Sequence, residues 1–192
     1  VAIEVNMGVL KEDQVNLIIH GHDPNMFESM IESVSEPGLV KAAKDAGAKG
    51  INLVGMCCSG AEVLVRHGIP HAGNFMSTES IMVTGAVDAM VVDVQCIIPN
   101  VQNVASRFHT KIVTTNPQAK ITGATHVEFR PENARGTAQQ IIDLAVANRA
   151  RRDPSRVHIP ATPPREIVAG FSAEQIVGAL AAVNPSDPLK PL

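Results

Sequence analysis

Aromatic residues are nearly absent from this sequence, which has no tryptophan, no tyrosine and an aromatic content of 3%. A core must therefore be built mainly from aliphatic side chains and methionine, and a hydrophobic content of 45% is enough for a globular chain. No apolar run approaches the roughly 20 residues of a membrane-spanning helix, and no signal peptide is visible. A net charge of -3 without a long basic run argues against nucleic acid as a partner.

Cysteine is also scarce. The three cysteines, two of them adjacent, do not form the pattern of a disulfide framework. Free thiols fit a reducing compartment, so a cytoplasmic location is expected. The sequence has no C-x-x-C pair, which argues against a zinc ribbon or a ferredoxin-type site. It also has no G-x-G-x-x-G in its first strand-to-helix turn, so support for a dinucleotide site is weak.

Short β-branched runs alternate with helical stretches along the chain. This pattern predicts an α/β, Rossmann-like, three-layer domain with a mostly parallel sheet of four or five strands. We expect Ile18, Leu53 and Val92 to be buried in it. Strands are predicted at residues 15–19, 51–56, 89–95, 111–115 and 125–129. Helices are predicted at 24–34, 37–46, 59–67, 100–108 and 133–149, from Ser77, and within 167–183 after a Ser172 cap.

The prolines indicate how the chain is divided. Residues 1–153 are expected to form the Rossmann-like core. A proline-rich stretch follows, so residues 154–192 are expected to be a connection, a C-terminal helix and a linker to a following domain that this chain lacks. The first residue is Val1 rather than Met, which suggests a piece of a longer protein.

All three cysteines and two of the seven histidines lie where predicted strands end. His20 and His22 follow the first strand, Cys57 and Cys58 the second, and Cys96 the third. The carboxyl ends of parallel strands share one edge of a sheet, and ligands bind in the crevice there. Thiolates and an imidazole at one edge are the ligands of a soft-metal or iron–sulfur site.

The residues alone leave several assignments open. Cys58 precedes a predicted helix whose positive end favours a thiolate, although a buried structural cysteine is the alternative. In an extended chain Cys57 and Cys58 point apart, so one faces the site and the other packs. Taken alone, Cys96 is better explained as a core residue than as a functional one. A functional role is supported by the sheet edge that it shares with Cys58. One of His20 and His22 is a ligand candidate, and the other supports it or packs.

Longer stretches carry a resemblance to a family. HGHDP (20–24), GAKGINLVGMCCSGAEVLVRHGIPHAGNF (47–75) and TGAVDAMVVDVQCIIPNV (84–101) closely resemble the nickel–iron–sulfur carbon monoxide dehydrogenases of anaerobes. FHTKIVTT (108–115) and GATHVEF (123–129) continue a likeness that covers nearly the whole chain. That family has a helical domain followed by two Rossmann-like domains, and this chain resembles the first of those two.

The resemblance implies an activity. Such enzymes oxidise CO with water to CO2, reversibly, at a nickel–iron–sulfur centre, and they carry further [4Fe-4S] clusters. They work as homodimers, pass electrons to an acceptor such as ferredoxin, and act alone or with an acetyl-CoA synthase. By motif, the resemblance assigns three ligands of the centre to His22, Cys58 and Cys96. Hybrid-cluster proteins, which use a comparable histidine segment, favour His22 over His20, and Cys58 matches the second cysteine of the family's pair.

Three ligands cannot enclose such a centre, so this chain alone is expected to be inactive. Two alternatives to the carbon monoxide dehydrogenase assignment stay open: a hybrid-cluster-type reductase domain, and an isolated domain with no activity of its own. A weaker third is an enzyme that uses Cys58 as a nucleophile and His22 as its base.

Overall fold

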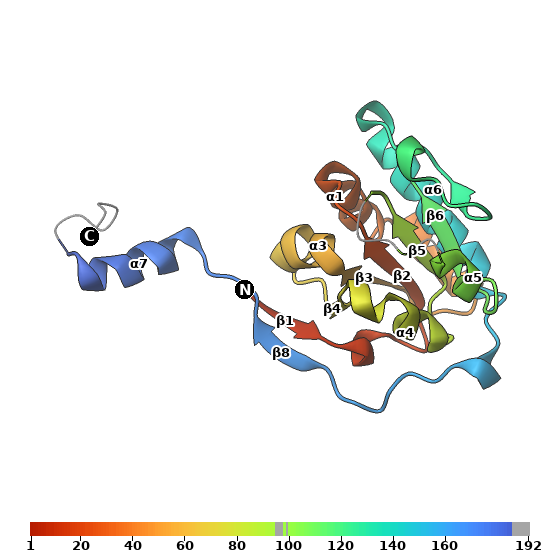
Figure 1. Ribbon diagram of the computed structural model, residues 1–192, viewed down its shortest axis with the longest axis horizontal. Coiled ribbons are helices and arrows are strands. Elements are labelled where there is room, and N and C mark those ends of the chain that lie inside the picture. The colour runs from red at the N-terminus through yellow and green to blue at the C-terminus, as the bar shows by residue number, and fades with distance from the viewer. Residues whose placement is uncertain (95–97, 99, 186–192) are drawn as a thin grey trace.

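The computed structural model describes residues 1–94, 98 and 100–185 (Figure 1). Within them, eight strands form one sheet in the order β7-β6-β5-β2-β3-β4-β1-β8. All neighbouring pairs are parallel except β1 and β8, which are antiparallel. The strands are β1 (Ala2–Val5), β2 (Val15–His20), β3 (Ile51–Met56), β4 (His71–Gly73), β5 (Ala89–Val92), β6 (Lys111–Thr114), β7 (Thr125–His126) and β8 (Arg165–Val168).

The order of the strands makes the sheet doubly wound. From the central strand β2 the chain proceeds outward through β3 to β4, then returns to the other side of β2 and proceeds through β5 and β6 to β7. The direction of winding therefore reverses between β2 and β5, which are direct neighbours. In open α/β sheets this switch point is where ligands bind, beyond the carboxyl ends of the strands.

Helices cover both faces of the sheet and complete three layers. The first helix shows how local sequence fixes a boundary: Asp23 accepts bonds from the amides of Asn25 and Met26, and Pro24 occupies the first turn. The α-helices are α1 (Pro24–Ser33), α2 (Pro37–Asp45), α3 (Cys57–Ser59), α4 (Thr78–Val83), α5 (Val101–Ala105), α6 (Ala134–Arg149) and α7 (Ala173–Val183), and a π-helical segment, Gly60–Leu64, extends α3.

The core lies in two layers because side chains alternate along the buried strands. Leu17 and Ile19 of β2 pack with α1, α2 and α6, whereas Ile18 packs on the opposite face with α4 and α5. Phe27 is the one aromatic residue among the largest fully buried side chains of the described residues. The predicted burial of Ile18, Leu53 and Val92 is confirmed.

The fold class is confirmed, but the predicted count of four or five strands is too low. The missing strands are β1, β4 and β8, which lie on one side of the sheet. β4 has three residues, and every residue of β8 is exposed, so neither has the buried apolar run that marks a central strand. The predicted final segment 167–183 is in fact the end of β8 followed by α7, and the Ser172 capping box is present.

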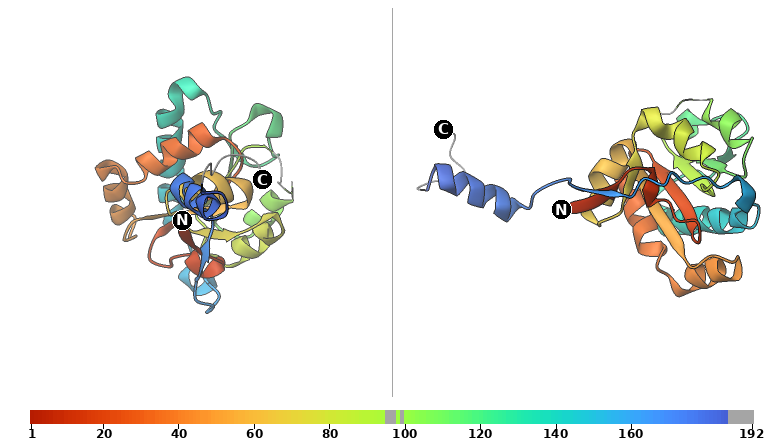
Figure 2. Two further views of the ribbon diagram at one scale, coloured as in Figure 1. Left: turned by 90° about the vertical axis from the view of Figure 1, so that its left-hand side faces the viewer. Right: turned by 90° about the horizontal axis from the view of Figure 1, so that it is seen from below.

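The chain beyond α6 first stays on the body of the molecule and then leaves it. Val157 and Ile159 pack against the layer under α4 and α5, and the His158 amide donates to the Thr84 carbonyl at 2.7 Å. After β8, helix α7 stands apart with no buried residue, as Figures 1 and 2 show. Among the described residues, no helix combines the length and the apolar character needed to cross a membrane. The division at residue 153 stays a prediction.

Candidate functional site

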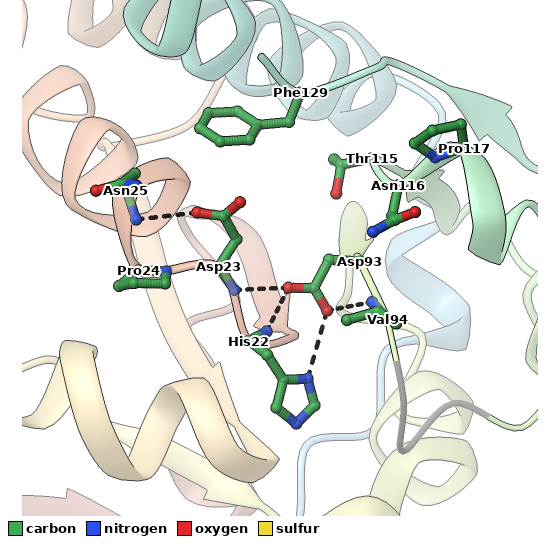
Figure 3. A pocket seen from close by; sticks show the side chains of 10 residues that line it. All are labelled: His22, Asp23, Pro24, Asn25, Asp93, Val94, Thr115, Asn116, Pro117 and Phe129. Carbon is green, nitrogen blue, oxygen red and sulfur yellow. Dashed lines mark hydrogen bonds and ion pairs between the residues drawn. The ribbon is translucent and has the colours of Figure 1, made fainter. Parts of the chain in front are cut away.

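A crevice lies at the switch point between β2 and β5 (Figure 3). It has a volume of about 370 Å³ and is open to the solvent. Loops after four parallel strands contribute to it, so the walls come from segments far apart in the sequence. The lining residues are His22, Asp23, Pro24, Asn25, Asp93, Val94, Thr115, Asn116, Pro117 and Phe129.

Asp93, which directly follows β5, organises one wall of this crevice. Its Oδ2 accepts bonds from the backbone amides of His22 and, at 2.7 Å, Asp23. Its Oδ1 accepts from the Val94 amide. The side chain is only 4% exposed. A buried carboxylate satisfied by three backbone donors is a fixed part of the structure, and it ties the loop after β2 to the loop after β5.

His22 points its imidazole at the same carboxylate. Its Nδ1 lies 3.5 Å from Asp93 Oδ1, and the side chain is 27% exposed. Hydrogen-bond geometry is not met at this distance, so the contact is electrostatic. The second ring nitrogen points away from Asp93 (Figure 3). The predicted ligand candidate thus lies at the crevice with one nitrogen turned from its carboxylate neighbour.

His20, the alternative candidate, is in a different environment. It is the last residue of β2, lies in register with Met56 and Val92, and is fully buried. Neither ring nitrogen has a hydrogen-bond partner. Burial lowers the pKa of His20 from 6.5 to about 4, so the ring is neutral at pH 7. An uncharged imidazole without partners in the sheet interior is unusual, because buried polar groups are normally satisfied.

Cys57 and Cys58 occupy the turn from β3 into α3. Cys57 has a left-handed backbone with φ of +58°, which directs the chain sharply into the helical segment. The expectation for an extended pair does not apply, because this turn brings the two sulfurs to 3.8 Å. Cys57 is half-buried against the layer under α4 and α5, whereas Cys58 is exposed. His71 Nε2 lies 3.0 Å from the Cys57 carbonyl oxygen and supports the turn.

The structure brings His22 and Cys58 to one edge, since β2 and β3 are adjacent, parallel strands in register. Cys58 does not line the crevice with His22. Cys96, the third predicted ligand, lies outside the described residues. Within the residues that the structure describes, no three His, Cys, Asp or Glu side chains form a group that could hold a metal ion.

Asp93 is a member of the site that the sequence motifs do not identify. A charged residue at the end of a buried strand is nevertheless a signal of a site at the sheet edge. The other histidines do not line this crevice. His71 and His126 have local structural contacts, and His109 belongs to a buried ion pair far from this edge.

Comparison with known proteins assigns the fold and the motifs to a family. Residues 1–184 match the model described as the Prismane/CO dehydrogenase family. The chain belongs to this family. Membership extends over every element described above, including α7, and it confirms the resemblance inferred from the sequence motifs.

Relatives within the family are similar along the whole chain. Carbon monoxide dehydrogenase 1 of Carboxydothermus hydrogenoformans is 49% identical over 193 residues, which cover 100% of this chain and 30% of the relative. The carbon monoxide dehydrogenase of Rhodospirillum rubrum is 50% identical over 187 residues, 97% of this chain and 29% of the relative. This chain therefore spans about 30% of the length of these relatives.

Solved structures agree with the sequence relatives. Carbon monoxide dehydrogenase IV from Carboxydothermus hydrogenoformans matches with a TM-score of 0.89 and 52% identity, over 100% of this chain and 30% of that one. An acetyl-CoA synthase/carbon monoxide dehydrogenase, described by NiZn[Fe4S4] and NiNi[Fe4S4] clusters in its alpha subunits, matches with a TM-score of 0.89 and 45% identity. That match covers 98% of this chain and 28% of the other.

Proposed function

We propose that this chain is the part of an anaerobic carbon monoxide dehydrogenase that supplies His22, Cys58 and Cys96 to a nickel–iron–sulfur centre. The observation that carries the proposal is the identity of 46–50% to carbon monoxide dehydrogenases over nearly the entire chain. In this proposal residues 1–153 form the ligand-bearing core, and residues 154–192 connect it to a following domain.

The donors at the carboxyl edge fit such a centre by their chemistry. Soft thiolate ligands and imidazole are what iron–sulfur and nickel sites use. Cys58 is exposed at the end of β3, and His22 presents one nitrogen away from its carboxylate neighbour. His20 is neutral and enclosed, so it is less accessible than His22 to a ligand arriving from the crevice. His22 is therefore the better candidate.

The residues of this chain have separate tasks in the proposed reaction, in which CO and water give CO2, two protons and two electrons. The centre, when bound, supplies a metal that acidifies water and a metal that takes CO. His22 and Cys58 hold the centre at the sheet edge, Asp93 fixes the loop that carries His22, and Cys57 packs beneath. The buried layer around Ile18 and Val92 excludes water from the interior side of the site.

The same proposal extends to the location, assembly, additional clusters and electron acceptor of the intact enzyme. It works in the cytoplasm as a homodimer, contains additional [4Fe-4S] clusters, and passes electrons to an acceptor such as ferredoxin. One relative is named as the beta subunit of carbon monoxide dehydrogenase/acetyl-CoA synthase in Moorella thermoacetica. An acetyl-CoA synthase partner is therefore proposed as an option. Nucleic acid is not a proposed partner, and this chain alone is proposed to be inactive.

A hybrid-cluster-type reductase is the second candidate, since the family description joins prismane proteins and CO dehydrogenases. The relatives at 46–50% identity are all named carbon monoxide dehydrogenases, which favours the first candidate. The test compares CO-dependent with hydroxylamine-dependent electron transfer in the full-length protein that carries this sequence. Turnover of hydroxylamine without turnover of CO contradicts the proposal.

The ligand assignment is tested with matched single substitutions in that full-length protein. Cys58→Ala and Cys96→Ala remove anionic sulfur ligands, so nickel and CO-dependent viologen reduction should be lost. His22→Ala should reduce the rate and leave part of the cluster in place. Cys57→Ala and His20→Ala are the controls and should be much milder. Equal losses for Cys57→Ala and Cys58→Ala would overturn the assignment, as would a larger loss for His20→Ala than for His22→Ala.

A further inference from the structure

We propose that Asp93 is a positioning residue that sets the tautomer and direction of the His22 imidazole. It does so while joining the two loops that lead from β2 and β5. This inference rests on the proposed function, because positioning the imidazole serves the reaction only if His22 is a metal ligand. The positioning role itself does not require a metal, so it is testable in the metal-free protein.

The Asp93 carboxylate is surrounded by hydrogen-bond donors from both loops. Oδ2 accepts from two amides of the His22 loop, and Oδ1 accepts from the amide of Val94 and faces His22 Nδ1 at 3.5 Å. The two loops are about 70 residues apart in sequence, as the separation of 71 between His22 and Asp93 shows. The carboxylate is 4% exposed, so these donors are its environment.

A side-chain amide cannot replace this carboxylate. Each oxygen of Asp93 has at least one backbone N–H pointing at it. An asparagine side chain has one acceptor oxygen and one NH2 group, so in either orientation its NH2 faces a backbone N–H. Two buried N–H donors would then face each other without an acceptor, and the loop would have to move to separate them. An acceptor-only side chain of this length is therefore required.

Gly21, the residue between the two histidines, lies against the same carboxylate. A Cβ atom built there would lie 2.5 Å from Asp93 Oδ1 and 2.6 Å from Oδ2. The backbone at Gly21 therefore approaches the carboxylate too closely for any side chain. Gly21 and Asp93 fit each other, and together they fix where the loop must place His22.

These contacts determine how the ring is presented. A carboxylate beside Nδ1 favours the tautomer that carries its proton on Nδ1, and the lone pair is then on Nε2. Figure 3 shows Nδ1 directed at Asp93 and the other ring nitrogen directed away. Asp93 thus prepares the imidazole to bind through the nitrogen that is free of the protein.

The experiment uses ¹⁵N NMR on the metal-free full-length protein that carries this sequence to determine the tautomer of His22, whose signals are assigned by their loss in His22→Gln. Asp93→Asn should shift His22 toward the Nε2–H tautomer. It should also raise the hydrogen-exchange rate of the Asp23 amide about tenfold or more, as expected for loss of a bond to a charged acceptor. The matched control is Asp23→Asn, which removes a charge from the same crevice and keeps an acceptable helix cap.

The outcomes separate the proposal from its alternatives. An unchanged His22 tautomer in Asp93→Asn overturns it, as does an equal shift in Asp23→Asn. Faster exchange without a tautomer change means that Asp93 is only structural, which also overturns it. If Asp93→Asn does not fold, Gly21→Ala displaces the carboxylate without removing its charge. A shift of the tautomer in that variant supports the proposal, and its absence refutes it.

A second measurement distinguishes this inference from the proposed function. In the full-length protein, Asp93→Asn should lower the metal affinity of the site about 10–100-fold. The nickel and iron content at a fixed metal supply should therefore fall. If His22→Ala leaves the metal content unchanged while the tautomer shift is observed, the positioning role stands and the ligand role of His22 fails. If both measurements change together, both are supported.

Discussion

The two ends of β5 carry the same residue type in opposite roles. Asp88 precedes the strand at the amino edge of the sheet, and Asp93 follows it at the carboxyl edge. Both side chains are buried, at 0% and 4% exposed. Asp88 is surrounded mainly by side chains, whereas the hydrogen-bond donors to Asp93 are backbone amides.

At the amino edge the charge is fully paired. Asp88 accepts bonds from Nη2 and, at 3.1 Å, Nε of Arg152, from His109 Nε2 at 2.9 Å and from the Asn16 amide at 2.7 Å. Arg152 also donates to the carbonyls of Glu12 and Gln14. This network ties the segment that follows α6 to the loop before β2 and to the amino end of β5.

At the carboxyl edge, some of the buried polar atoms have no hydrogen-bond partner. The backbone amides around Asp93 are bonded, yet both ring nitrogens of His20 and Nδ1 of His22 have no hydrogen-bond partner. Burial of an aspartate therefore does not identify its role. Asp88 has the Arg152 guanidinium as its partner, whereas Asp93 has backbone amides as partners and lies beside two histidines with unpartnered ring nitrogens.

The largest effect is expected from breaking the amino-edge pair with Arg152→Met. Asp88 would be left as a buried carboxylate without its guanidinium, so the free energy of unfolding should fall by about 3–5 kcal/mol. Urea denaturation measures this change. Arg151→Met, at the exposed neighbouring position, is the control and should stay within about 0.5 kcal/mol of the wild type. A loss below about 1 kcal/mol for Arg152→Met would contradict the role given to the pair.

A pH titration of stability tests the carboxyl edge. Burial lowers the pKa of His20 to about 4, whereas the unfolded chain keeps the ordinary value of 6.5. Between these values the unfolded state binds a proton that the folded state does not, so stability falls as pH falls. The loss from this residue is on the order of 3 kcal/mol across that window. His20→Leu should remove this part of the slope, and an unchanged slope would show that His20 does not titrate abnormally.

A smaller loss is expected from Gly21→Ala, which crowds the Asp93 carboxylate. The added methyl would meet Asp93 at 2.5 Å, and the carboxylate is held by three amides, so it cannot move freely. The free energy of unfolding should fall by about 1–3 kcal/mol. Gly50→Ala meets nothing within 4 Å and should be neutral or stabilising by up to about 1 kcal/mol. Equal effects of the two changes would argue against a close fit at Gly21.

The sequence was sufficient for the central strands β2, β3, β5 and β6 because each is a buried run of apolar residues bounded by polar turns. It also predicted that the ends of β2 and β3 share an edge, which places His22 and Cys58 there. It did not predict β1, β4 and the edge strand β8, because β1 and β4 have only four and three residues and every residue of β8 is exposed. It could not predict the Asp88–Arg152 pair, since the partners are 64 residues apart. The role of Cys96 stays a prediction.

The smallest effect is expected from the exposed ion pair at the same amino edge. Lys49 Nζ lies 2.9 Å from Asp13 Oδ2, with side chains 79% and 50% exposed. The Lys49 ammonium holds the pKa of Asp13 below its usual value, but water screens the attraction and both side chains lose freedom in making it. Asp13→Asn should therefore leave the urea midpoint unchanged in 0.15 M salt, whereas Arg152→Met lowers it strongly. A shift in Asp13→Asn comparable to that in Arg152→Met would mean that proximity to the amino edge, rather than burial of the charges, determines how much an ion pair stabilises this sheet.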